Sequence, residues 1–336
     1  MRESLLEVKN LKVSFFNRSG EVKAIRGVSF HVEKGEILGV VGESGSGKSV
    51  TSLSIMRLLK GTGKITEGEI IFKGENLLDK SEKEMMKIRG NDIAMIFQDP
   101  MTSLNPVFTV GNQISDVIRR HQGLSKINAR KKAIEMLDMV GIPSPEERFN
   151  SYPHEFSGGM RQRALIAMAL SCKPDLLIAD EPTTALDVTI QAQILNLLME
   201  LKEKLNTSVI LITHDLGVVA NTCSRVIVMY SGLVMEEGII EDIFHNPLHP
   251  YTKGLLQSLP KAKGEKKQRL IPIKGNPPDL TVEIEGCPFA ERCPNVMDIC
   301  FRKQPRYYYK GENHRAMCWL LDESVDRKGE NNGYEK

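Results

Sequence analysis

A glycine-rich segment near residue 45 has the residue types and spacing of a phosphate-binding loop. It fits the pattern G-x-x-x-x-G-K-[ST] and consists of Gly42, Glu43, Ser44, Gly45, Ser46, Gly47, Lys48 and Ser49. Its glycines allow backbone amides to point into one concavity, where a triphosphate can lie at the amino terminus of a helix. Lys48 would place a positive charge on the β- and γ-phosphates, and the Ser49 hydroxyl would bind Mg²⁺. The segment predicts a nucleotide site that includes Val50, with a chance glycine-rich turn as the alternative.

Two consecutive carboxylates follow an apolar run later in the chain. Asp180 ends the run at residues 176–180, an arrangement that holds Mg²⁺ in nucleotide-hydrolysing proteins, usually through water. Glu181 comes next and could orient and deprotonate an attacking water. Taken alone, the pair could equally be a solvated acidic strand end.

Four further segments accompany the loop and the carboxylates. Residues 156–162 read Phe-Ser-Gly-Gly-Met-Arg-Gln, and residues 184–187 read Thr-Ala-Leu-Asp. Gln98 follows the apolar run 93–97, and His214 follows the run 209–213. In this order they resemble the signature motif, D-loop, Q-loop and switch histidine of ATP-binding cassette (ABC) proteins. Each segment alone is weak evidence for this family. Together, and in a chain with a phosphate-binding loop, they are specific for it.

The resemblance to ABC ATPases covers about residues 5–260 and implies a mechanism. In that family two nucleotide domains close head to tail, and each ATP lies between one phosphate-binding loop and the partner's signature. The resemblance implies that Ser157, Gly158 and Gly159 face the partner's γ-phosphate. It further implies that Gln98 and Ser49 bind Mg²⁺, that Asp180 holds the metal through water, and that His214 steadies the γ-phosphate during catalysis by Glu181 and Lys48.

Two regions bear on how closely the chain follows the family. Phe15 lies where the family places an aromatic ring against adenine, although a core phenylalanine is an alternative and Phe16 competes for the role. The signature carries Phe156 in place of Leu and Met160 in place of Gln. Because a thioether cannot make the hydrogen bonds of an amide, the resemblance does not assign Met160 a nucleotide contact.

A narrower resemblance points to the ATPases of oligopeptide and dipeptide permeases. It rests on residues 98–106, 156–163, 249–252 and 286–293. Such importers contain two different ATPases, and residues 98–106 and 156–163 resemble the first of them rather than the second. The resemblance implies as partners two integral membrane permease subunits, a second ABC ATPase and an extracytoplasmic peptide-binding protein. It implies no nucleic acid partner.

Four cysteines gather in the last 50 residues: Cys287, Cys293, Cys300 and Cys318. In a reducing cytosol such a group is more typical of a metal site than of disulfides. Tight Cys-x₂-Cys pairs are absent and widely spaced thiolates suit an iron–sulfur cube, so a 4Fe–4S cluster, zinc and free thiols all stay open. The similar tail of dipeptide permease ATPases carries a 4Fe–4S cluster, and the resemblance implies the same here. His314 is a further candidate ligand, with a surface position as the simpler interpretation.

The elements needed to position these residues indicate an α/β fold. Buried strand-like runs at residues 37–41, 176–179, 209–212 and 226–229 alternate with helical patterns. We expect a P-loop NTPase (ABC ATPase) core with an antiparallel β portion, an inserted α-helical subdomain at about residues 100–171 and a small Cys-rich extension. The predicted domains are residues 1–260 and 261–336. A Lys-, Gly- and Gln-rich linker opens the second, and its polar end after residue 322 is expected to be poorly ordered.

The composition restricts the location and the partners. Forty-five basic against 43 acidic residues leave a net charge of +2, which gives no strong field towards nucleic acid or anionic lipid. No stretch approaches the roughly 18 consecutive apolar residues of a spanning helix. The charged first residues do not fit a secretory signal. We expect a cytosolic protein bound peripherally to the cytoplasmic face of the cell membrane.

Other functions share these motifs. An importer of nickel or another small solute would use the same ATPase, since the ATPase never touches the cargo. An ABC ATPase acting on nucleic acid would also share every nucleotide motif, but it usually carries two cassettes or a long coiled-coil insertion. A regulatory module with an inactive phosphate-binding loop is disfavoured by the intact Lys48, Asp180, Glu181 and His214.

Overall fold

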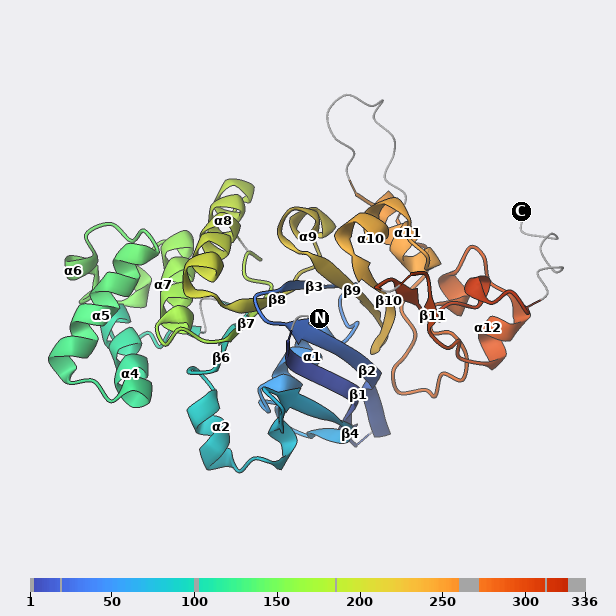
Figure 1. The fold of residues 1–336 in the computed structure, drawn as a ribbon, viewed down its shortest axis with the longest axis horizontal. Helices are drawn as coiled ribbons and strands as arrows, with labels where there is room; N and C mark the ends of the chain where they lie inside the picture. The colour runs from blue at the N-terminus through green and yellow to red at the C-terminus, as the bar shows by residue number, and fades with distance from the viewer. Residues whose placement is uncertain are drawn as a thin grey trace, which may run out of the picture.

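A computed structural model describes residues 3–18, 20–99, 103–184, 186–259, 272–311 and 313–325. Two β-sheets form its centre, a group of helices lies at one end, and the C-terminal segment lies at the other (Figure 1). The predicted linker at residues 261–269 and the final residues after 325 lie outside the described ranges. So does residue 100, the predicted start of the helical subdomain.

The N-terminal part of the chain forms an antiparallel sheet of four strands in the order β2-β1-β4-β5. Its strands are β1 (Ser4–Asn17), β2 (Gly20–Glu33), β4 (Gly63–Phe72) and β5 (Glu75–Asn76). Along β1, buried residues such as Leu6, Val8 and Leu11 alternate with exposed ones, as expected for a sheet with one face in the core. This confirms the predicted antiparallel portion.

The second sheet has eight strands in the order β11-β12-β10-β9-β3-β8-β7-β6. Five neighbouring strands are parallel, namely β9 (Arg225–Tyr230), β3 (Ile37–Val41), β8 (Ser208–Ile212), β7 (Leu176–Asp180) and β6 (Ile93–Ile96). Parallel strands are covered on both faces, which explains their nearly continuous apolar sequences. Because the strands run in one direction, the residues after β3, β6, β7 and β8 meet at one edge of the sheet.

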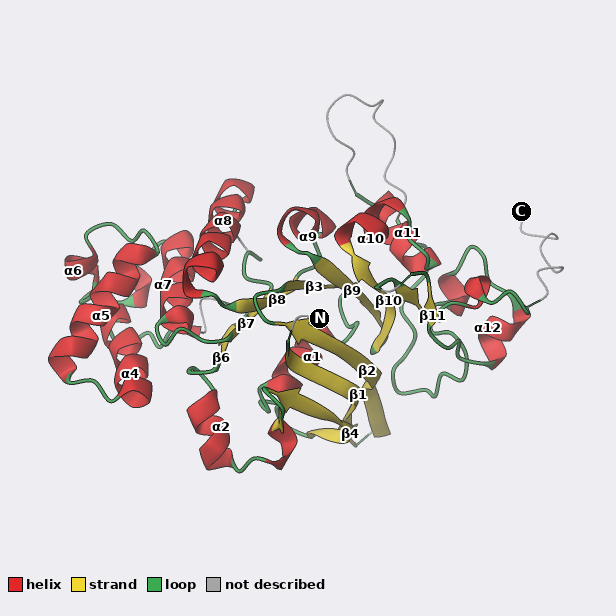
Figure 2. Ribbon diagram, in the orientation of Figure 1, coloured by secondary structure: helices red, strands yellow, loops and turns green. Residues whose placement is uncertain are grey.

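The helices separate into groups (Figure 2). At the end away from the tail lie α4 (Val110–Gln122), α5 (Lys126–Met139), α6 (Pro145–Arg148), η2 (Pro153–Glu155) and α7 (Gly158–Leu170). The others are α1 (Lys48–Ile55), η1 (Leu77–Asp79), α2 (Glu82–Ile88), α8 (Val188–Leu205), α9 (Leu216–Thr222), α10 (Ile240–His245) and α11 (Pro250–Gln257). The first group occupies the region where the sequence predicts an inserted helical subdomain. No helix of the described chain is both long enough and apolar enough to cross a bilayer.

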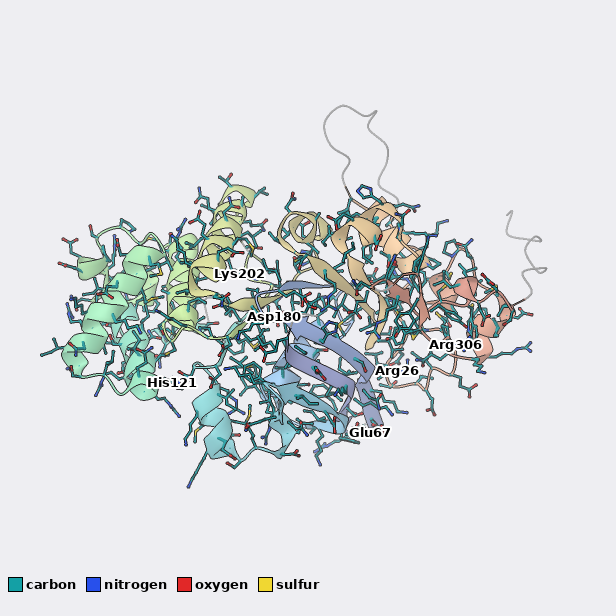
Figure 3. All side chains as sticks on the ribbon, viewed as in Figure 1. Arg26, Glu67, His121, Asp180, Lys202 and Arg306 are labelled. Atoms are coloured by element: carbon teal, nitrogen blue, oxygen red, sulfur yellow. The ribbon has the colours of Figure 1, made fainter. Side chains whose placement is uncertain are left out.

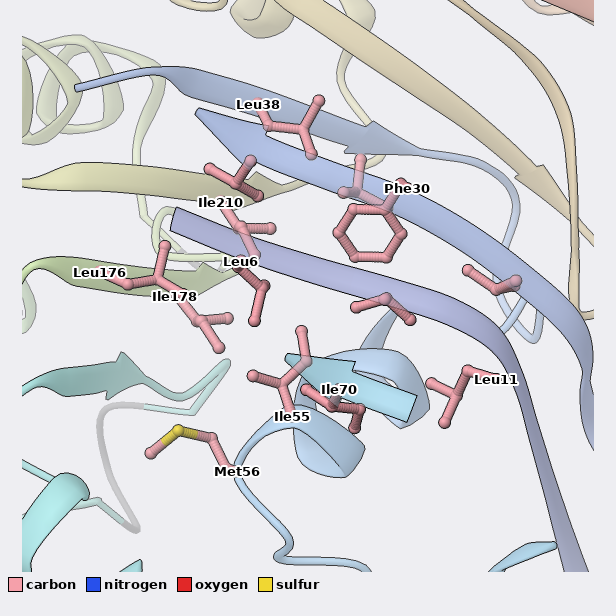
Figure 4. Close-up of a cluster of buried hydrophobic side chains, with 14 of the residues drawn as sticks. Leu6, Leu11, Phe30, Leu38, Ile55, Met56, Ile70, Leu176, Ile178 and Ile210 are labelled. Atoms are coloured by element: carbon pink, nitrogen blue, oxygen red, sulfur yellow. The ribbon is translucent and has the colours of Figure 1, made fainter. Parts of the chain in front are cut away.

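One apolar core fixes the first helix between the two sheets (Figure 4). Ile55 and Met56 lie at the end of α1, Leu6 and Phe30 belong to the antiparallel sheet, and Ile178 belongs to the parallel strands. All five are at least 94% buried. Burying a side chain of this size contributes roughly 1.5–3 kcal/mol, so this core holds α1 and the loop before it rigidly.

The C-terminal segment is built onto the second sheet. β12 (Arg315–Ala316) pairs with β10 (Leu233–Ile239), and β11 (Tyr308–Tyr309) pairs with β12. The segment also contains η3 (Ala290–Arg292), α12 (Asp298–Arg302) and η4 (Trp319–Leu321), and α12 lies beyond β11 at the end of the molecule (Figure 1). The sheet therefore runs across the domain boundary that the sequence suggests at residue 260.

Candidate functional site

The glycine-rich segment forms a tight loop between β3 and α1. Gly42 has a φ of 152°, and a Cβ at this position would lie 2.2 Å from the carbonyl oxygen of Met229. Gly47 precedes α1 with a φ of 103°. Both conformations are readily available only to glycine. The loop therefore places its amides at the amino terminus of α1, as the sequence predicts.

Lys48 is folded back over this loop. Its Nζ donates to the carbonyl oxygens of Gly42 at 2.8 Å and Glu43 at 3.0 Å. Burial lowers the pKa of Lys48, and the nearby Glu181 and Asp180 oppose this by favouring the charged form. The hydroxyl oxygen of Ser46 is also buried, and it has no hydrogen-bond partner among the described residues. A buried cation beside an unpaired hydroxyl fits a bound phosphate group.

The side chains of Ser49 and Asp180 are in contact at the edge of the sheet where the parallel strands end. The Ser49 hydroxyl donates to Asp180 Oδ1 at 3.1 Å. Asp180 is the last residue of β7 and lies near the centre of the molecule (Figure 3). Burial raises the pKa of its carboxyl, which a divalent cation would counteract. The two oxygens fit the Mg²⁺ site expected from the sequence.

Side chains that follow three different strands contact the carboxylate of Glu181. Its Oε2 accepts a hydrogen bond from Gln98 Nε2 at 3.1 Å and lies 3.6 Å from His214 Nδ1. The hydroxyl of Thr184 also donates to this oxygen, at 2.8 Å. Glu181 has a φ of 48°, an uncommon value for a residue other than glycine and one often found at functional sites. The structure thus brings together Gln98, Glu181 and His214, which are separated along the chain.

The signature motif lies apart from this group. Ser157 is the N-cap of α7, and its hydroxyl accepts a hydrogen bond from the Met160 amide at 3.3 Å. Ser157 and Gly158 are exposed, whereas Gly159 and Met160 are half-buried, and Met160 packs against the core of the helical group. In the D-loop, Asp187 is the N-cap residue of α8, and residue 185 is outside the described ranges. The signature helix is therefore free to present its amino terminus to another molecule.

The two candidate adenine contacts differ in exposure. Phe15 is half-buried and packs against the core between the sheets, and a Cβ on Gly63 would lie 2.7 Å from its ring. Phe16 is 41% exposed, and Lys64 Nζ lies 5.9 Å from the centre of its ring. The role of either ring towards adenine stays a prediction.

The four tail cysteines line one small cavity of about 10 Å³ together with Trp319 and His249. Burial raises the pKa of Cys287 and Cys318 to about 12 and that of Cys293 to about 11. Backbone hydrogen bonds reach the sulfur atoms, in three cases from the residue two positions later: Phe289, Asn295 and Leu320. Within the described ranges, however, no group of three or more His, Cys, Asp or Glu side chains is arranged to hold one metal ion. Ligation of a cluster stays a prediction.

The interpretation of His314 as a surface residue is wrong. Its side chain is 2% exposed, and its Nε2 lies 2.8 Å from Oε1 of the fully buried Glu236. A histidine in a short strand-like segment carries no local pattern that would reveal this pairing.

Sequence reasoning missed two side chains that hold the phosphate-binding loop from outside. The Tyr251 hydroxyl accepts a hydrogen bond from the Glu43 amide at 2.9 Å, and Arg292 pairs with the Glu43 carboxylate. Both residues lie in segments that resemble peptide permease ATPases. This resemblance was the only feature of the sequence that drew attention to them.

Taken together, a phosphate-binding loop, a buried aspartate and an adjacent glutamate at the edge of a parallel sheet define a P-loop nucleotide-hydrolysing protein. Comparison with known proteins narrows this class. The ABC transporter family model matches residues 25–184, and the model of the oligopeptide/dipeptide transporter C-terminal region matches residues 235–300.

Relatives match along nearly the whole chain. The dipeptide transport ATP-binding protein DppD of Bacillus subtilis is 57% identical over 96% of this chain and 97% of its own. The oligopeptide transport ATP-binding protein OppD of Salmonella typhimurium is 52% identical over 95% of both chains. The dimeric, ADP- and Pi-bound structure of the ATP-binding cassette MJ0796 is 31% identical with a TM-score of 0.63, covering 70% of this chain and 98% of that one. The chain belongs to the ABC transporter family, and it is an ATPase of that family.

Proposed function

We propose that the chain is the ATP-hydrolysing subunit of an importer of dipeptides or oligopeptides. The observation that carries this proposal is the similarity to peptide transport ATP-binding proteins over the whole chain, tail included. The nucleotide motifs alone would fit any ABC ATPase, so the peptide cargo rests on the similarity.

Each site residue has a role in the proposed reaction. Lys48 and the amides of residues 42–49 would bind the phosphates, while Ser49, Gln98 and Asp180 would hold Mg²⁺. The metal would supply positive charge to offset that of the phosphates. Glu181 orients the water and accepts its proton, and His214 holds the γ-phosphate. Such catalysis consists of positioning and electrostatic stabilisation, which suits a site built from rigid strand ends.

The second half of each site comes from another nucleotide domain. The exposed Ser157 and Gly158 at the start of α7 would approach the γ-phosphate bound to a partner ATPase. A helix amino terminus favours a negative charge, so the partner's ATP would bind the two domains together.

A groove between α2, α4 and β6 is the proposed docking place for a permease. It has a volume of about 630 Å³, and its lining includes Met56, Met86, Met95, Phe97, Val117 and Met168. Phe97 is 42% exposed, Met86 is 40% exposed, and Figure 3 labels His121 on the α4 side of this region. A groove lined by methionines, with Met86 and Phe97 exposed, suits an amphipathic helix, and Phe97 adjoins Gln98. A cytoplasmic helix of a membrane permease in this groove would sense ATP through Gln98 and would hold the chain at the cytoplasmic face of the membrane.

Purification from membranes tests this assignment. We expect the captured chain to bring two permeases and a second ABC ATPase, and a peptide-loaded binding protein to stimulate ATP hydrolysis by the complex. Stimulation by nickel or another small solute instead would indicate that this solute is the cargo. Retention on nucleic acid without permeases would contradict it.

We further propose that the chain has a nucleotide-binding domain at residues 1–260, with a helical subdomain at about residues 100–171, and a Cys-rich extension at residues 261–336. In the extension, Cys287, Cys293, Cys300 and Cys318 would bind a 4Fe–4S cluster with a structural role. Four thiols on one buried cavity, with backbone amides donating to sulfur, support iron–sulfur ligation, and zinc is the alternative.

Metal analysis of anaerobically purified protein checks the extension. We expect about four irons per chain, and their loss when Cys287 and Cys318 are both replaced by Ser. Cys172→Ser is the matched control, because this thiol lies outside the cavity. One zinc per chain would favour the alternative metal, and absence of both metals would leave the cysteines as free thiols.

A further inference from the structure

The C-terminal segment contacts the phosphate-binding loop at Glu43. Arg292 Nη1 donates to Glu43 Oε2 at 2.6 Å, and Nη2 donates to Oε1 at 3.0 Å. This two-armed geometry is the strongest form of an arginine–carboxylate pair. Glu43 holds the pKa of Arg292 above its usual value. The pair therefore joins two segments 249 residues apart in the chain.

Arg292 is held in place by its own surroundings. Its side chain is only 4% exposed, and it also donates to the Tyr230 hydroxyl at 3.1 Å and, through Nε, to the carbonyl oxygen of Lys274 at 3.0 Å. Its guanidinium carbon lies 5.6 Å from the centre of the Tyr230 ring and 5.9 Å from that of Phe289. A guanidinium fixed on so many sides can impose its position on Glu43.

Glu43 in turn touches the groups that prepare the loop for phosphate. Its carbonyl oxygen accepts hydrogen bonds from Lys48 Nζ at 3.0 Å and from the Ser46 amide at 3.2 Å. Its own amide donates to the Tyr251 hydroxyl. A shift of Glu43 would therefore move both the lysine that binds phosphate and the turn that carries Ser46.

The charge of Glu43 also requires a counter-charge. A carboxylate inside a phosphate-binding loop repels a triphosphate, and this repulsion is strong in a partly buried site. Arg292 neutralises Glu43 and holds both of its oxygens.

We propose that Arg292 is a positioning residue for ATP binding, through which the C-terminal segment holds and neutralises Glu43 of the phosphate-binding loop. This inference rests on the proposed ATPase function. It makes the C-terminal segment part of the nucleotide site rather than only an appendage to it.

The test compares Arg292→Ala, Glu43→Gln and the double variant in the full chain. In Arg292→Ala, the charge-assisted pair beside bound phosphate is lost. We expect this variant to have a Kd for a non-hydrolysable ATP analogue, and a KM for ATP, about tenfold above those of the wild type. The kcat should change by less than about twofold, because the interaction acts on binding. The double variant should recover affinity to within about threefold of wild type, because the uncompensated charge is gone.

Arg292→Lys and Arg302→Ala complete the design. Lysine keeps the charge but not the two-armed geometry, so it should give an intermediate Kd, and it decides the question if Arg292→Ala does not fold. Arg302 is an exposed arginine of the same segment, and its replacement should leave the Kd unchanged. A wild-type Kd in Arg292→Ala, or a double variant as weak as Arg292→Ala, would overturn the inference. Failure of the wild type to bind the analogue would instead overturn the proposed function.

Discussion

At the scale of single residues, the main feature of the site is that one carboxylate oxygen of Glu181 is held by neighbouring side chains without nucleotide. One oxygen of its carboxylate receives Gln98 and Thr184 and lies beside His214. These three side chains follow three different strands, so the carboxylate is oriented by the protein itself. An oriented base loses little freedom when water binds, which is how a pre-formed site lowers a barrier.

Glu181→Gln tests whether this carboxylate is the base. An amide fills the same space and still accepts from Gln98 and Thr184, but it cannot take a proton from water. We expect ATP to bind as in the wild type and turnover to fall by roughly 10²- to 10⁴-fold, the usual effect of losing a general base. Single-turnover phosphate release measured beside nucleotide affinity separates the two steps. Unchanged turnover would show that another group accepts the proton.

At the scale of elements, Glu236 joins three segments around β10. Its two oxygens accept from the amides of Leu248 and His249, at 2.7 and 2.9 Å, and it also pairs with His314. Burial by itself raises the pKa of Glu236, but these partners outweigh burial and hold the pKa below its ordinary value. The carboxylate therefore links β10, the start of α11 and the C-terminal segment.

Glu236→Gln should destabilise the fold by about 1–3 kcal/mol near neutral pH, because one buried amide loses its acceptor. The unfolded carboxyl binds protons at a higher pH than the folded one. Wild-type stability from this group is thus present above about pH 4.5 and is lost as the pH falls further. Urea unfolding at neutral and acidic pH should show the gap between the two proteins narrowing in acid.

The exposed Glu241→Gln serves as the control for this effect, and it should follow the wild type at both pH values. A gap that stays constant or widens in acid would contradict the assignment of the lowered pKa to Glu236.

The same scale shows what sequence patterns can and cannot reveal. The strands β3, β7 and β8 were predictable because a buried parallel strand is a short apolar run. Gly42 was predictable from the phosphate-binding loop pattern, and the structure gives the reason, because the loop backbone admits no side chain there. The resemblance to ABC ATPases implies that Glu181 and His214 act on the same γ-phosphate, and the pairing of β7 with β8 brings the two residues together. By contrast, the contact of Arg292 with Glu43 and the burial of His314 depend on long-range docking of the C-terminal segment, whose described strands are only two residues long. No local periodicity marks such strands.

At the scale of the whole molecule, the phosphate-binding loop and the signature helix lie in different parts of one chain. α7 lies among the helices at one end, and α1 lies between the two sheets (Figure 1). Ser157 makes its hydrogen bonds within its own helix. This arrangement suits a site completed by a second molecule.

Gly158→Asp tests this division. Among the residues that the structure describes, a Cβ at Gly158 meets Leu186 alone, at an ordinary distance of 3.5 Å, so the variant should fold. In the proposed two-domain site, the added negative charge would face the partner's γ-phosphate. In the complex with the partner ATPase, we expect this chain to keep its own affinity for ATP while turnover at the opposite site falls by roughly 10²-fold, as when a group that stabilises the transition state is lost. Gly158→Ala, which adds bulk without charge, is the matched variant. Full turnover in Gly158→Asp would show that α7 does not complete a partner's site.

The pairing of β12 with β10 has a consequence for any shortened form of the protein. With the tail in place, the outermost strand on this side of the large sheet is β11, which is only two residues long and offers little backbone to a neighbour. Removing everything after residue 260 would leave β10, a seven-residue strand that begins with Leu, Val and Met, as the border on this side. Unpaired strands of that length recruit other chains. A cassette trimmed to its minimal length would therefore tend to self-associate and precipitate, for reasons unrelated to its chemistry.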